Sequence, residues 1–232
     1  MIKPKIKIAL AGNPNSGKST LFNAFTGLKQ KVGNYPGITV EKKSGTSVLS
    51  KEINAEVIDL PGTYSLFSKS MDEKVAQQVL CNIDDSDYPD VIVVIADATN
   101  LRRSIFLLTQ IIDLNMNVVL ALNMVDIATK KGLVINAPLL SIELGIPVVA
   151  INARKQMGID SLKEAIINKL KKSPKRPFLA VRKLFKGVIE KANEIRGIEN
   201  DFASFLAMCK QELGGEKQNR EALNKLCKDN DI

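Results

Sequence analysis

Apolar residues gather in short continuous runs along the first two thirds of the chain. These runs lie near residues 6–11, 57–60, 91–96, 118–122 and 147–151. Each run has the length of a strand, and an unbroken apolar run is typical of a strand that is covered on both faces of its sheet. We therefore expect these segments to be the central strands of one buried sheet.

Apolar residues at helical spacing follow the first run, and strand-like and helix-like segments then alternate. Such alternation predicts a doubly wound, mostly parallel α/β sheet, in which ligands bind at the carboxyl ends of the strands. Residues 39–57 should supply antiparallel strands at the edge of this sheet. The helix after the first strand is predicted from Leu21, Phe22, Ala24, Phe25 and Leu28.

The pattern changes near residue 172. Residues 169–177 combine five basic residues with two prolines, which favours a solvated linker; contact with an anionic membrane surface is the alternative. The helical stripe that follows is usually core, with a surface buried against another subunit as the alternative. The predicted domains are residues 1–172 and a helical domain of residues 173–232. The stripe comprises Phe178, Val181, Leu184, Phe185, Val188, Ile189, Ala192, Ile195, Phe202, Phe205, Leu206, Cys209 and Leu213 and, after Gly214 and Gly215, Leu223, Leu226 and Cys227.

The connection between the first strand and its helix has the residue spacing of a phosphate-binding loop. Glycines let the backbone curl so that successive N–H groups point at phosphate oxygens, and the helix N-terminus that follows favours anions. Lys18 should reach the β- and γ-phosphates, and Ser19 should bind the Mg²⁺ that bridges them. The loop and its flank comprise Gly12, Asn13, Pro14, Asn15, Ser16, Gly17, Lys18, Ser19 and Thr20.

Three further segments follow predicted strands and argue against a chance match, although each alone could be an ordinary turn. Asp59-Leu60-Pro61-Gly62 ends a strand with a carboxylate that can hold Mg²⁺ through water, and Gly62 can turn its N–H onto a γ-phosphate. Asp126 of Asn123-Met124-Val125-Asp126 can accept the N1–H and N2–H₂ of guanine, a donor pair that adenine lacks. Backbone N–H groups of Asn152-Ala153-Arg154 could meet the guanine O6. The predicted nucleotide is GTP.

Amino-acid composition limits the classes of protein to which this chain can belong. The 232 residues are 45% hydrophobic, which is too apolar for disorder and sufficient for an α/β domain with a smaller appendage. Cys81, Cys209 and Cys227 are widely spaced and histidine is absent, so we expect buried thiols rather than a disulfide framework or a zinc site. We expect no signal peptide before the first strand, and no apolar stretch has the length of a membrane helix. We expect this polypeptide to be soluble.

The net charge of +8 leaves two other functions open beside GTP hydrolysis. A ribosome- or RNA-associated GTPase is the first, but no aromatic residues are interleaved with the basic cluster and no RNA-binding module follows residue 172, so we expect no nucleic acid partner. A GTP-binding switch with negligible hydrolysis is the second. Thr63 stands where many GTPases have a glutamine that positions water, so slow intrinsic turnover is expected.

Four segments add a pattern that is more specific than the phosphate loop alone. They are Gly33-Asn34-Tyr35-Pro36-Gly37-Ile38-Thr39-Val40-Glu41, Asp59-Leu60-Pro61-Gly62-Thr63-Tyr64-Ser65-Leu66, Asp97-Ala98-Thr99-Asn100-Leu101-Arg102-Arg103 and Asn123-Met124-Val125-Asp126. With the phosphate loop, they resemble the cytosolic N-terminal part of the bacterial ferrous iron transport protein B family. The resemblance is close from residue 5 to about residue 170 and weak beyond. It implies a P-loop NTPase of the Ras-like G domain type, then a small helical domain like a guanine-nucleotide dissociation inhibitor.

This resemblance implies a GTPase that binds GTP or GDP with Mg²⁺ and serves as a nucleotide switch for Fe(II) uptake at the cytoplasmic face of the bacterial inner membrane. Thr39 would close over Mg²⁺ and the γ-phosphate, within a segment that GTP orders and hydrolysis releases and that includes Gly37 and Ile38. Asn15 would ligate a K⁺ ion that stimulates hydrolysis. The implied partners are the transmembrane iron-permeation domain of the same transporter, small cytosolic proteins and further copies of the chain. The alternatives are an ordinary surface turn at residues 33–41 and an Asn15 that only stabilises its loop.

Two positions depart from the pattern of the resembled family. Asn152 replaces the usual hydroxyl residue in the last base-contacting loop, which puts the conformation of that loop and the GDP release rate in question. Met124 replaces the usual lysine of the base-reading motif, although its flexible thioether can still lie over a ring face. Guanine specificity should therefore depend on Asp126.

Overall fold

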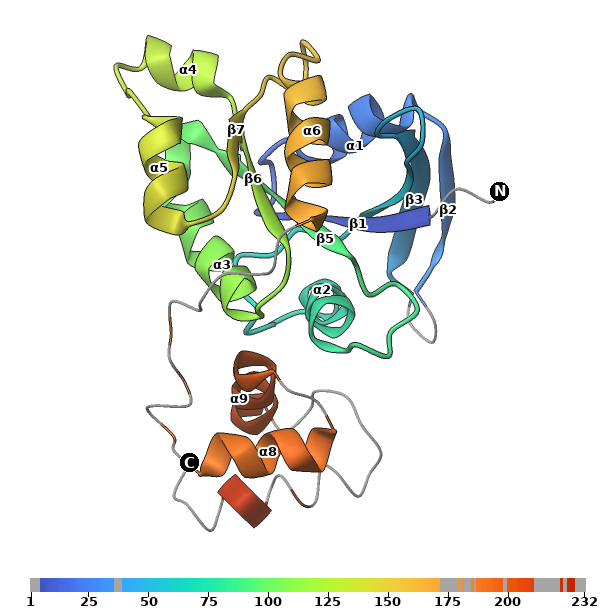
Figure 1. The fold of residues 1–232 in the computed structure, drawn as a ribbon, viewed down its shortest axis with the longest axis vertical. Helices are drawn as coiled ribbons and strands as arrows, with labels where there is room; N and C mark the ends of the chain where they lie inside the picture. The colour runs from blue at the N-terminus through green and yellow to red at the C-terminus, as the bar shows by residue number, and fades with distance from the viewer. Residues whose placement is uncertain are drawn as a thin grey trace.

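The computed structural model describes residues 5–35, 39–171, 179, 181, 185, 187–197, 200–210, 222 and 225–227. Several positions considered above lie outside this part of the chain: residues 36–38, which include Gly37 and Ile38, residues 172–178, Leu184, residues 213–215, Leu223 and the side chain of Cys209. Figure 1 shows the helices and strands of the described residues. They are β1 (Lys5–Gly12), α1 (Lys18–Thr26), β2 (Gln30–Asn34), β3 (Glu41–Val48), β4 (Asn54–Asp59), α2 (Met71–Cys81), β5 (Val91–Asp97), η1 (Ala98–Asn100), α3 (Leu101–Asp113), β6 (Val118–Asn123), α4 (Val125–Lys130), α5 (Ala137–Leu144), β7 (Val148–Ala150), α6 (Ile159–Leu170), α8 (Val188–Arg196) and α9 (Asp201–Lys210).

A seven-stranded sheet with the order β2-β3-β4-β1-β5-β6-β7 forms the centre of the fold. β1 lies between β4 and β5 and is parallel to both, and β6 is parallel to β5 and β7. β3 is antiparallel to both β2 and β4. The predicted doubly wound, mostly parallel α/β sheet is therefore confirmed.

Helices cover both faces of this sheet (Figure 1), and alternate residues of its central strands pack against different helices. Ile8 of β1 packs in one cluster with Phe22 of α1 and Leu162 of α6. The adjacent Ala9 belongs to a second cluster, which contains Leu108 of α3 and residues of α2. Because neither face of β1 meets water, its sequence is apolar without alternation.

The edge of the sheet corrects one prediction. Residues 39–57 supply β3 and the start of β4, but the outermost antiparallel strand, β2, comes from residues before Thr39. Every residue of β2 is exposed, so no apolar alternation marks it in the sequence. Its backbone pairing with β3 makes it a strand. β2 contains Gly33 and Asn34, residue types that are more common at the edge of a sheet than in a central strand.

The end of α1 corrects a second prediction. The helix stops at Thr26 because Gly27 takes a left-handed φ of 60° and closes the last turn onto Asn23. Leu28 therefore lies beyond the helix, where it is 72% exposed. Leu21, Phe22 and Phe25 are buried as the helical spacing predicted.

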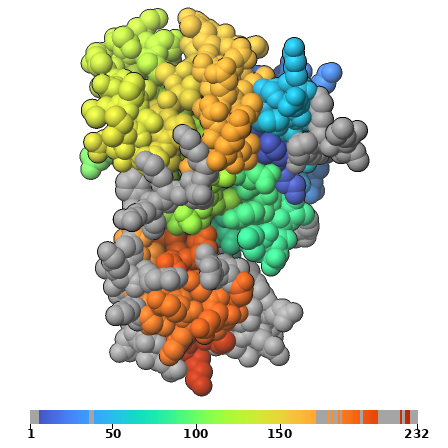
Figure 2. Space-filling view, viewed as in Figure 1, coloured from blue at the N-terminus to red at the C-terminus, as the bar shows by residue number. Residues whose placement is uncertain are grey.

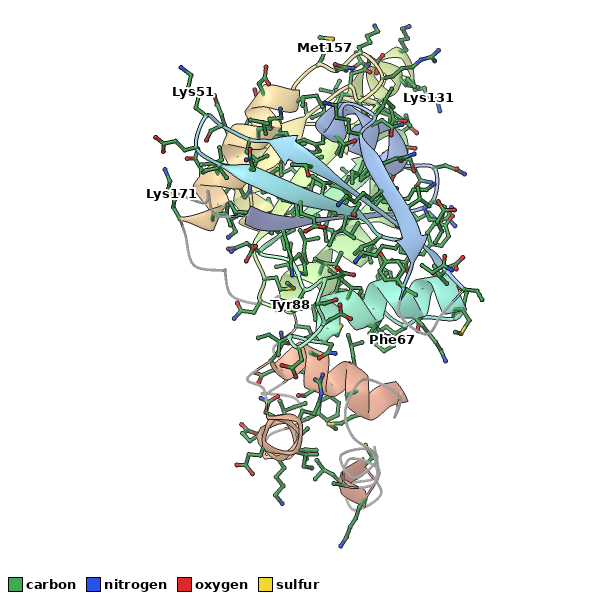
Figure 3. All side chains as sticks on the ribbon, turned by 90° about the vertical axis from the view of Figure 1, so that its right-hand side faces the viewer. Lys51, Phe67, Tyr88, Lys131, Met157 and Lys171 are labelled. Carbon is green, nitrogen blue, oxygen red and sulfur yellow. The ribbon has the colours of Figure 1, made fainter. Side chains whose placement is uncertain are left out.

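The helical part packs against the ends of α2 and α3, and Figure 2 shows it as a second lobe, coloured orange and red. Asn200 donates its side-chain N–H to the carbonyl of Leu114 at 2.7 Å, and Arg196 donates to the carbonyl of Cys81 at 3.4 Å. Figure 3 shows Phe67 and Tyr88 beside α2, on the side of the sheet that carries this lobe. The two parts of the chain therefore share one apolar interior.

The described members of the helical stripe are core residues within a single chain. Ile189, Ala192 and Leu206 are completely buried, and they belong to the same apolar cluster as residues of α2 and α3. Phe185 and Phe205 stack with ring centroids 5.4 Å apart. For these residues, the interpretation as core is confirmed, whereas the domain boundary at residue 172 stays a prediction.

Candidate functional site

The connection from β1 to α1 forms a tight loop at the carboxyl end of the sheet. Ser16 donates its backbone N–H to the carbonyl of Asn13 at 3.2 Å, and α1 begins at Lys18 immediately after Gly17. No side chain caps the first turn of α1, so its N–H groups stay available to a ligand. A helix N-terminus of this kind favours an anion.

Two glycines of the loop cannot be replaced without a clash. A β-carbon on Gly17, which has a φ of 94°, would lie 2.2 Å from Nδ2 of Asn123. A β-carbon on Gly12 would lie 2.6 Å from the carbonyl oxygen of Ile95. The neighbouring strands β5 and β6 thus approach the loop so closely that only glycine fits.

Asn15 has a left-handed backbone, with a φ of 64°, which asparagine tolerates better than most residues. Its side chain is exposed. Among the described residues its amide makes no hydrogen bond, so this structure does not show the loop-stabilising bond that was the alternative to ion binding. An amide oxygen suits an alkali cation, and the residue fits the K⁺ site that the sequence suggested.

The predicted magnesium ligands are partly assembled. The hydroxyl of Ser19 donates to Oδ2 of Asp59 at 3.2 Å, and the Lys18 ammonium forms an ion pair with Oδ1 of the same carboxylate. Asp59 is buried at the end of β4. Hydroxyl and carboxylate oxygens are hard donors, so this pair of side chains suits Mg²⁺. Lys18 here contacts Asp59 rather than a phosphate.

Thr39 is not brought to this pair. It is exposed, and among the described residues its side chain has no hydrogen bond. A hollow of about 320 Å³ beside Lys18, Ser19 and Asp59 is lined by Val40 and Gly62 but not by Thr39. The role predicted for Thr39 therefore requires a rearrangement of its segment.

Gly62 packs directly on the phosphate loop. A β-carbon added there would lie 3.2 Å from atoms of Pro14, and the next residue, Thr63, donates its N–H to the carbonyl of Gly12 at 3.2 Å. Leu60 of the same motif is completely buried and donates its N–H to Leu10. Leu60 therefore anchors this motif in the core, while Gly62 reaches the site.

The side chain of Thr63 points inward. It is buried, and its hydroxyl donates to the carbonyl of Ser65 at 2.7 Å and contacts Glu73 at 3.2 Å. In this arrangement the hydroxyl is occupied by the protein. These hydrogen bonds support the prediction that Thr63 does not take the role of a water-positioning glutamine.

Glu73 of α2 is a residue of this region that the sequence analysis missed. Its carboxylate accepts the N–H of Lys69 at 2.8 Å and the hydroxyl of Thr63. Burial alone would raise the pKa of Glu73, but the hydrogen bonds from Lys69, Tyr64 and Thr63 outweigh it and lower the pKa from 4.5. The signal was present, because Ser70 caps α2 and stands three residues before Glu73, the spacing of a capping box.

Three further contacts tie residues 64–66 to α3. The Arg103 guanidinium lies 3.8 Å from the ring centroid of Tyr64. Oε1 of Gln110 accepts the N–H of Leu66 at 2.7 Å and the hydroxyl of Ser65 at 3.1 Å. Residues 63–66 are thus held between α2 and α3, and helical spacing alone gives no sign of these polar bonds.

Asn123 joins the phosphate loop to the last predicted base-contacting loop. Its Nδ2 donates to the carbonyl of Ser16 at 3.0 Å, and its Oδ1 accepts the N–H of Ala153 at 3.1 Å. The side chain is buried, so both bonds are shielded from water. The Ala153 N–H, which the sequence suggested for the guanine O6, is engaged by Asn123 in this structure.

Met124 and Asp126 lie at the start of α4. Met124 has a left-handed φ of 61°, and its terminal methyl would lie 3.9 Å from a β-carbon on Gly17. Its side chain therefore lies against the phosphate loop. Asp126 is exposed in the first turn of α4, and its carboxylate has no ion pair or hydrogen bond within the described residues.

Asn152 closes the loop that follows β7. Its Oδ1 accepts the N–H of Lys155 at 3.0 Å, and its backbone exchanges two hydrogen bonds with Met157. This departure from the family pattern thus has a structural role, because the asparagine fixes the turn at residues 152–157. Arg154 projects from the same turn and is exposed.

The remaining expectations concern metals, thiols and membranes. Within the described part of the chain, no group of three histidine, cysteine or acidic residues could hold a metal ion. Cys81 and Cys227 are buried free thiols, as predicted, and burial raises the pKa of Cys81 to about 12. No helix of the described residues has the length and apolar character needed to cross a bilayer.

Comparison with known proteins agrees with this arrangement. The family model described as Ferrous iron transport protein B matches residues 6–166. The Fe(2+) transporter FeoB of Salmonella typhimurium is 43% identical over 162 residues, which are 70% of this chain and 21% of that protein. This chain therefore spans about a fifth of the length of such relatives.

Solved structures are similar to this chain over more of its length than the family model covers. The cytosolic domain of L. pneumophila FeoB is 36% identical with a TM-score of 0.78, covering 96% of this chain and 88% of that one. The cytosolic domain of T. maritima FeoB in its GMPPNP form is 34% identical with a TM-score of 0.74, covering 97% and 98%. The match over residues 6–166 and these neighbours show that the chain belongs to the ferrous iron transport protein B family.

Proposed function

We propose that this chain binds guanine nucleotides and hydrolyses GTP to GDP and phosphate, as the nucleotide switch of a ferrous iron transporter. The observation that carries the proposal is the assembled loop at residues 12–19, which is fixed by Asn123 and faces Asp59. Among the related FeoB structures, one from S. thermophilus is bound to GDP and one from T. maritima is in a GMPPNP form. The same ligands fit the loop described here.

The phosphate groups would meet the free N–H groups at the start of α1. Lys18 would leave Asp59 for the β- and γ-phosphates, because a phosphate oxygen offers the ammonium a second, more highly charged partner. Ser19 and Asp59 would hold Mg²⁺, directly and through water, with Thr39 as a further ligand. A bound Mg²⁺ would neutralise charge on the β- and γ-phosphate oxygens.

Asp126 would select the base. Its free carboxylate is placed to accept the two donors on one edge of guanine, while Met124 covers a ring face and the loop at residues 152–154 approaches the O6. Adenine would leave the carboxylate without a partner, at a cost of about 1–3 kcal/mol. Since Asn123 occupies the Ala153 N–H, the O6 contact requires an adjustment of this loop or a neighbouring N–H.

Hydrolysis would depend on the backbone and on a cation. A water molecule attacks the γ-phosphorus as the bond to the β–γ bridging oxygen breaks, and the Gly62 N–H would stabilise the γ-phosphate oxygens. Thr63 is turned inward and supplies no group to this water. Asn15, with its free amide, would hold a K⁺ ion that offsets the charge of the transition state.

The decisive experiment compares steady-state GTP turnover in KCl and NaCl at equal ionic strength. The wild-type chain should be faster in KCl by about tenfold or more, and Asn15→Ala should remove that ratio while GDP still binds. Asn115→Ala is the matched control, because Asn115 is also exposed with a positive φ, 55°, but lies outside the site. Equal rates in the two salts would disprove the K⁺ part of the proposal.

A nucleotide switch that hardly hydrolyses GTP is the second candidate, because the buried Thr63 hydroxyl gives the site no side chain that positions water. Single-turnover cleavage of radiolabelled GTP in KCl separates the two. Release of phosphate within minutes supports the enzyme, whereas tight binding without release supports the switch alone.

The transporter role concerns more of the protein than this chain. The Salmonella relative is named an Fe(2+) transporter, and this chain corresponds to 21% of it. We propose that the remainder contains the membrane domain through which iron passes and that the nucleotide state of this chain regulates it at the cytoplasmic face. Iron uptake by a full-length transporter carrying Lys18→Ala tests this: undiminished uptake would contradict the regulatory role.

A further inference from the structure

The outer edge of β2 is open. All five residues of Gln30–Asn34 are exposed, and within the described residues no strand pairs with the outer side of β2. Figure 1 places β2 at the right-hand margin of the sheet, and Figure 3 views the molecule from that side. The opposite edge, β7, is only three residues long and partly buried. Natural proteins usually protect long open edges, because these pair readily with other strands.

The backbone groups that β2 offers can be assigned from its pairing with β3. Tyr35 donates its N–H to the carbonyl of Val40 at 3.1 Å, and the register continues inward from Asn34 opposite Glu41. In an antiparallel ladder, pairs that exchange hydrogen bonds alternate with pairs that do not. Gln30, Val32 and Asn34 therefore turn their N–H and C=O groups away from β3.

The side chains along this edge combine positive charge with an apolar residue. Lys29 and Lys31 are exposed, and within the described residues neither has an ion pair. By contrast, Lys42 and Lys43 of the adjacent β3 are paired with acidic residues. Val32 directly follows Lys31 and therefore points to the other face of β2, where it is 59% exposed.

A hollow lies beside the two free lysines. It has a volume of about 320 Å³ and is lined by Lys29, Gln30 and Lys31, by residues 44–46 of β3 and by Glu56 of β4. Gly45 lets the end of α1 approach, since a β-carbon there would lie 2.6 Å from Cγ2 of Thr26 and 2.7 Å from the carbonyl oxygen of Lys29. The hollow provides room for a side chain carried by an added strand.

We propose that β2 is a docking edge for an extended acidic segment of a partner protein, which joins the sheet as an additional strand. Main-chain hydrogen bonds to Gln30, Val32 and Asn34 would give the affinity. Carboxylates facing Lys29 and Lys31, and an apolar residue against Val32, would give the specificity. A second copy of the chain is a poor occupant, because β2 against β2 would bring the lysines of both copies together.

Two synthetic hexapeptides of alternating sequence test the proposal with the whole chain. One is an acetylated glutamate–valine repeat, and the other is the lysine–valine repeat with the same apolar positions. Amide exchange is followed by NMR for residues 30–34. The acidic peptide should slow exchange at Gln30, Val32 and Asn34 by at least about threefold, and the basic peptide should leave it unchanged.

Charge reversal separates this edge from general electrostatic attraction. Lys31→Glu should abolish the protection by the acidic peptide, whereas Lys171→Glu, at an exposed lysine beyond α6 that Figure 3 labels, changes the net charge equally and should leave the protection intact. Val32→Pro removes one outward N–H at a position where an edge strand tolerates proline, and it should weaken protection of the two neighbours. The proposal is overturned if the acidic peptide protects none of the three amides, if both peptides protect them equally, or if the chain dimerises through β2.

Discussion

The phosphate loop and the segment that carries Thr39 differ in how firmly contacts with the rest of the protein fix them. The loop is held by Asn123 through Ser16 and is pressed against the carbonyl of Ile95. Thr39 is exposed and makes no side-chain hydrogen bond within the described residues. The difference teaches that contacts within the protein fix the loop proposed to hold the β-phosphate, whereas the proposed closure of Thr39 over a γ-phosphate requires its segment to move. On the proposed function, the γ-phosphate and its Mg²⁺ would supply the free energy for that movement.

The largest effect should come from a substitution that disrupts the phosphate loop. Gly17→Ala places a methyl group 2.2 Å from Nδ2 of Asn123 at a φ of 94°. Backbone strain of about 1–2 kcal/mol and loss of a buried hydrogen bond worth about 1–2 kcal/mol should weaken GDP binding by roughly thirty- to a thousandfold. Titration calorimetry measures the change.

Gly27→Ala is the matched control for this substitution. Gly27 also has a left-handed φ, 60°, but nothing lies within 4 Å of an added β-carbon. It should lower the free energy of unfolding by about 1 kcal/mol and leave GDP affinity unchanged. Equal loss of affinity in both variants would show that the loop is not specially constrained.

A smaller and more selective effect should come from a substitution in the segment that carries Thr39. Thr39→Ala removes the hydroxyl proposed to close over Mg²⁺, so affinity for a non-hydrolysable GTP analogue should fall by about tenfold, or roughly 1.4 kcal/mol. GDP affinity should stay the same, because GDP lacks the γ-phosphate and Thr39 does not line the hollow beside Lys18 and Ser19. Competition binding with both nucleotides gives the ratio, and a parallel loss for GDP would contradict the comparison.

The smallest effect should come from residues 63–70, a segment that begins with the hydrogen bond from the N–H of Thr63 to Gly12 of the phosphate loop. The pKa of Glu73 is lowered by the N–H groups and hydroxyl that its carboxylate accepts, although its burial opposes this. The stabilisation is therefore complete above the ordinary pKa of 4.5 and is lost as the pH falls through the lowered value. Protection of the Lys69 amide, corrected for intrinsic exchange, should decrease over that acidic range.

Glu73→Gln should remove this pH dependence, because the neutral amide cannot titrate. Asp72→Asn, at the exposed neighbour in the same helical turn, should keep it. If the Lys69 amide of the Glu73→Gln variant still loses protection with falling pH, another group controls this loop.

The sequence predicted the motifs of the site better than their contacts. The loop at residues 12–19 and Asp59 meet as expected, because strand ends of a parallel sheet converge at one edge. The contact of Asn123 with both Ser16 and Ala153 was not foreseen, since it joins residues from three strand ends. Glu73 could have been found from the Ser70 capping box, whereas Gln110 and Arg103 leave no comparable signal.

By itself, the sequence determined which segments become buried strands and which residue types line the phosphate loop. Those properties depend on local composition. A continuous apolar run favours burial, and glycine permits the backbone conformation of the phosphate loop. Only the tertiary structure decided that β2 is an open edge, that Thr63 turns inward onto Glu73, and that Thr39 does not line the hollow beside Ser19. Each of these depends on how segments distant in the chain pack together, and no local pattern records such packing.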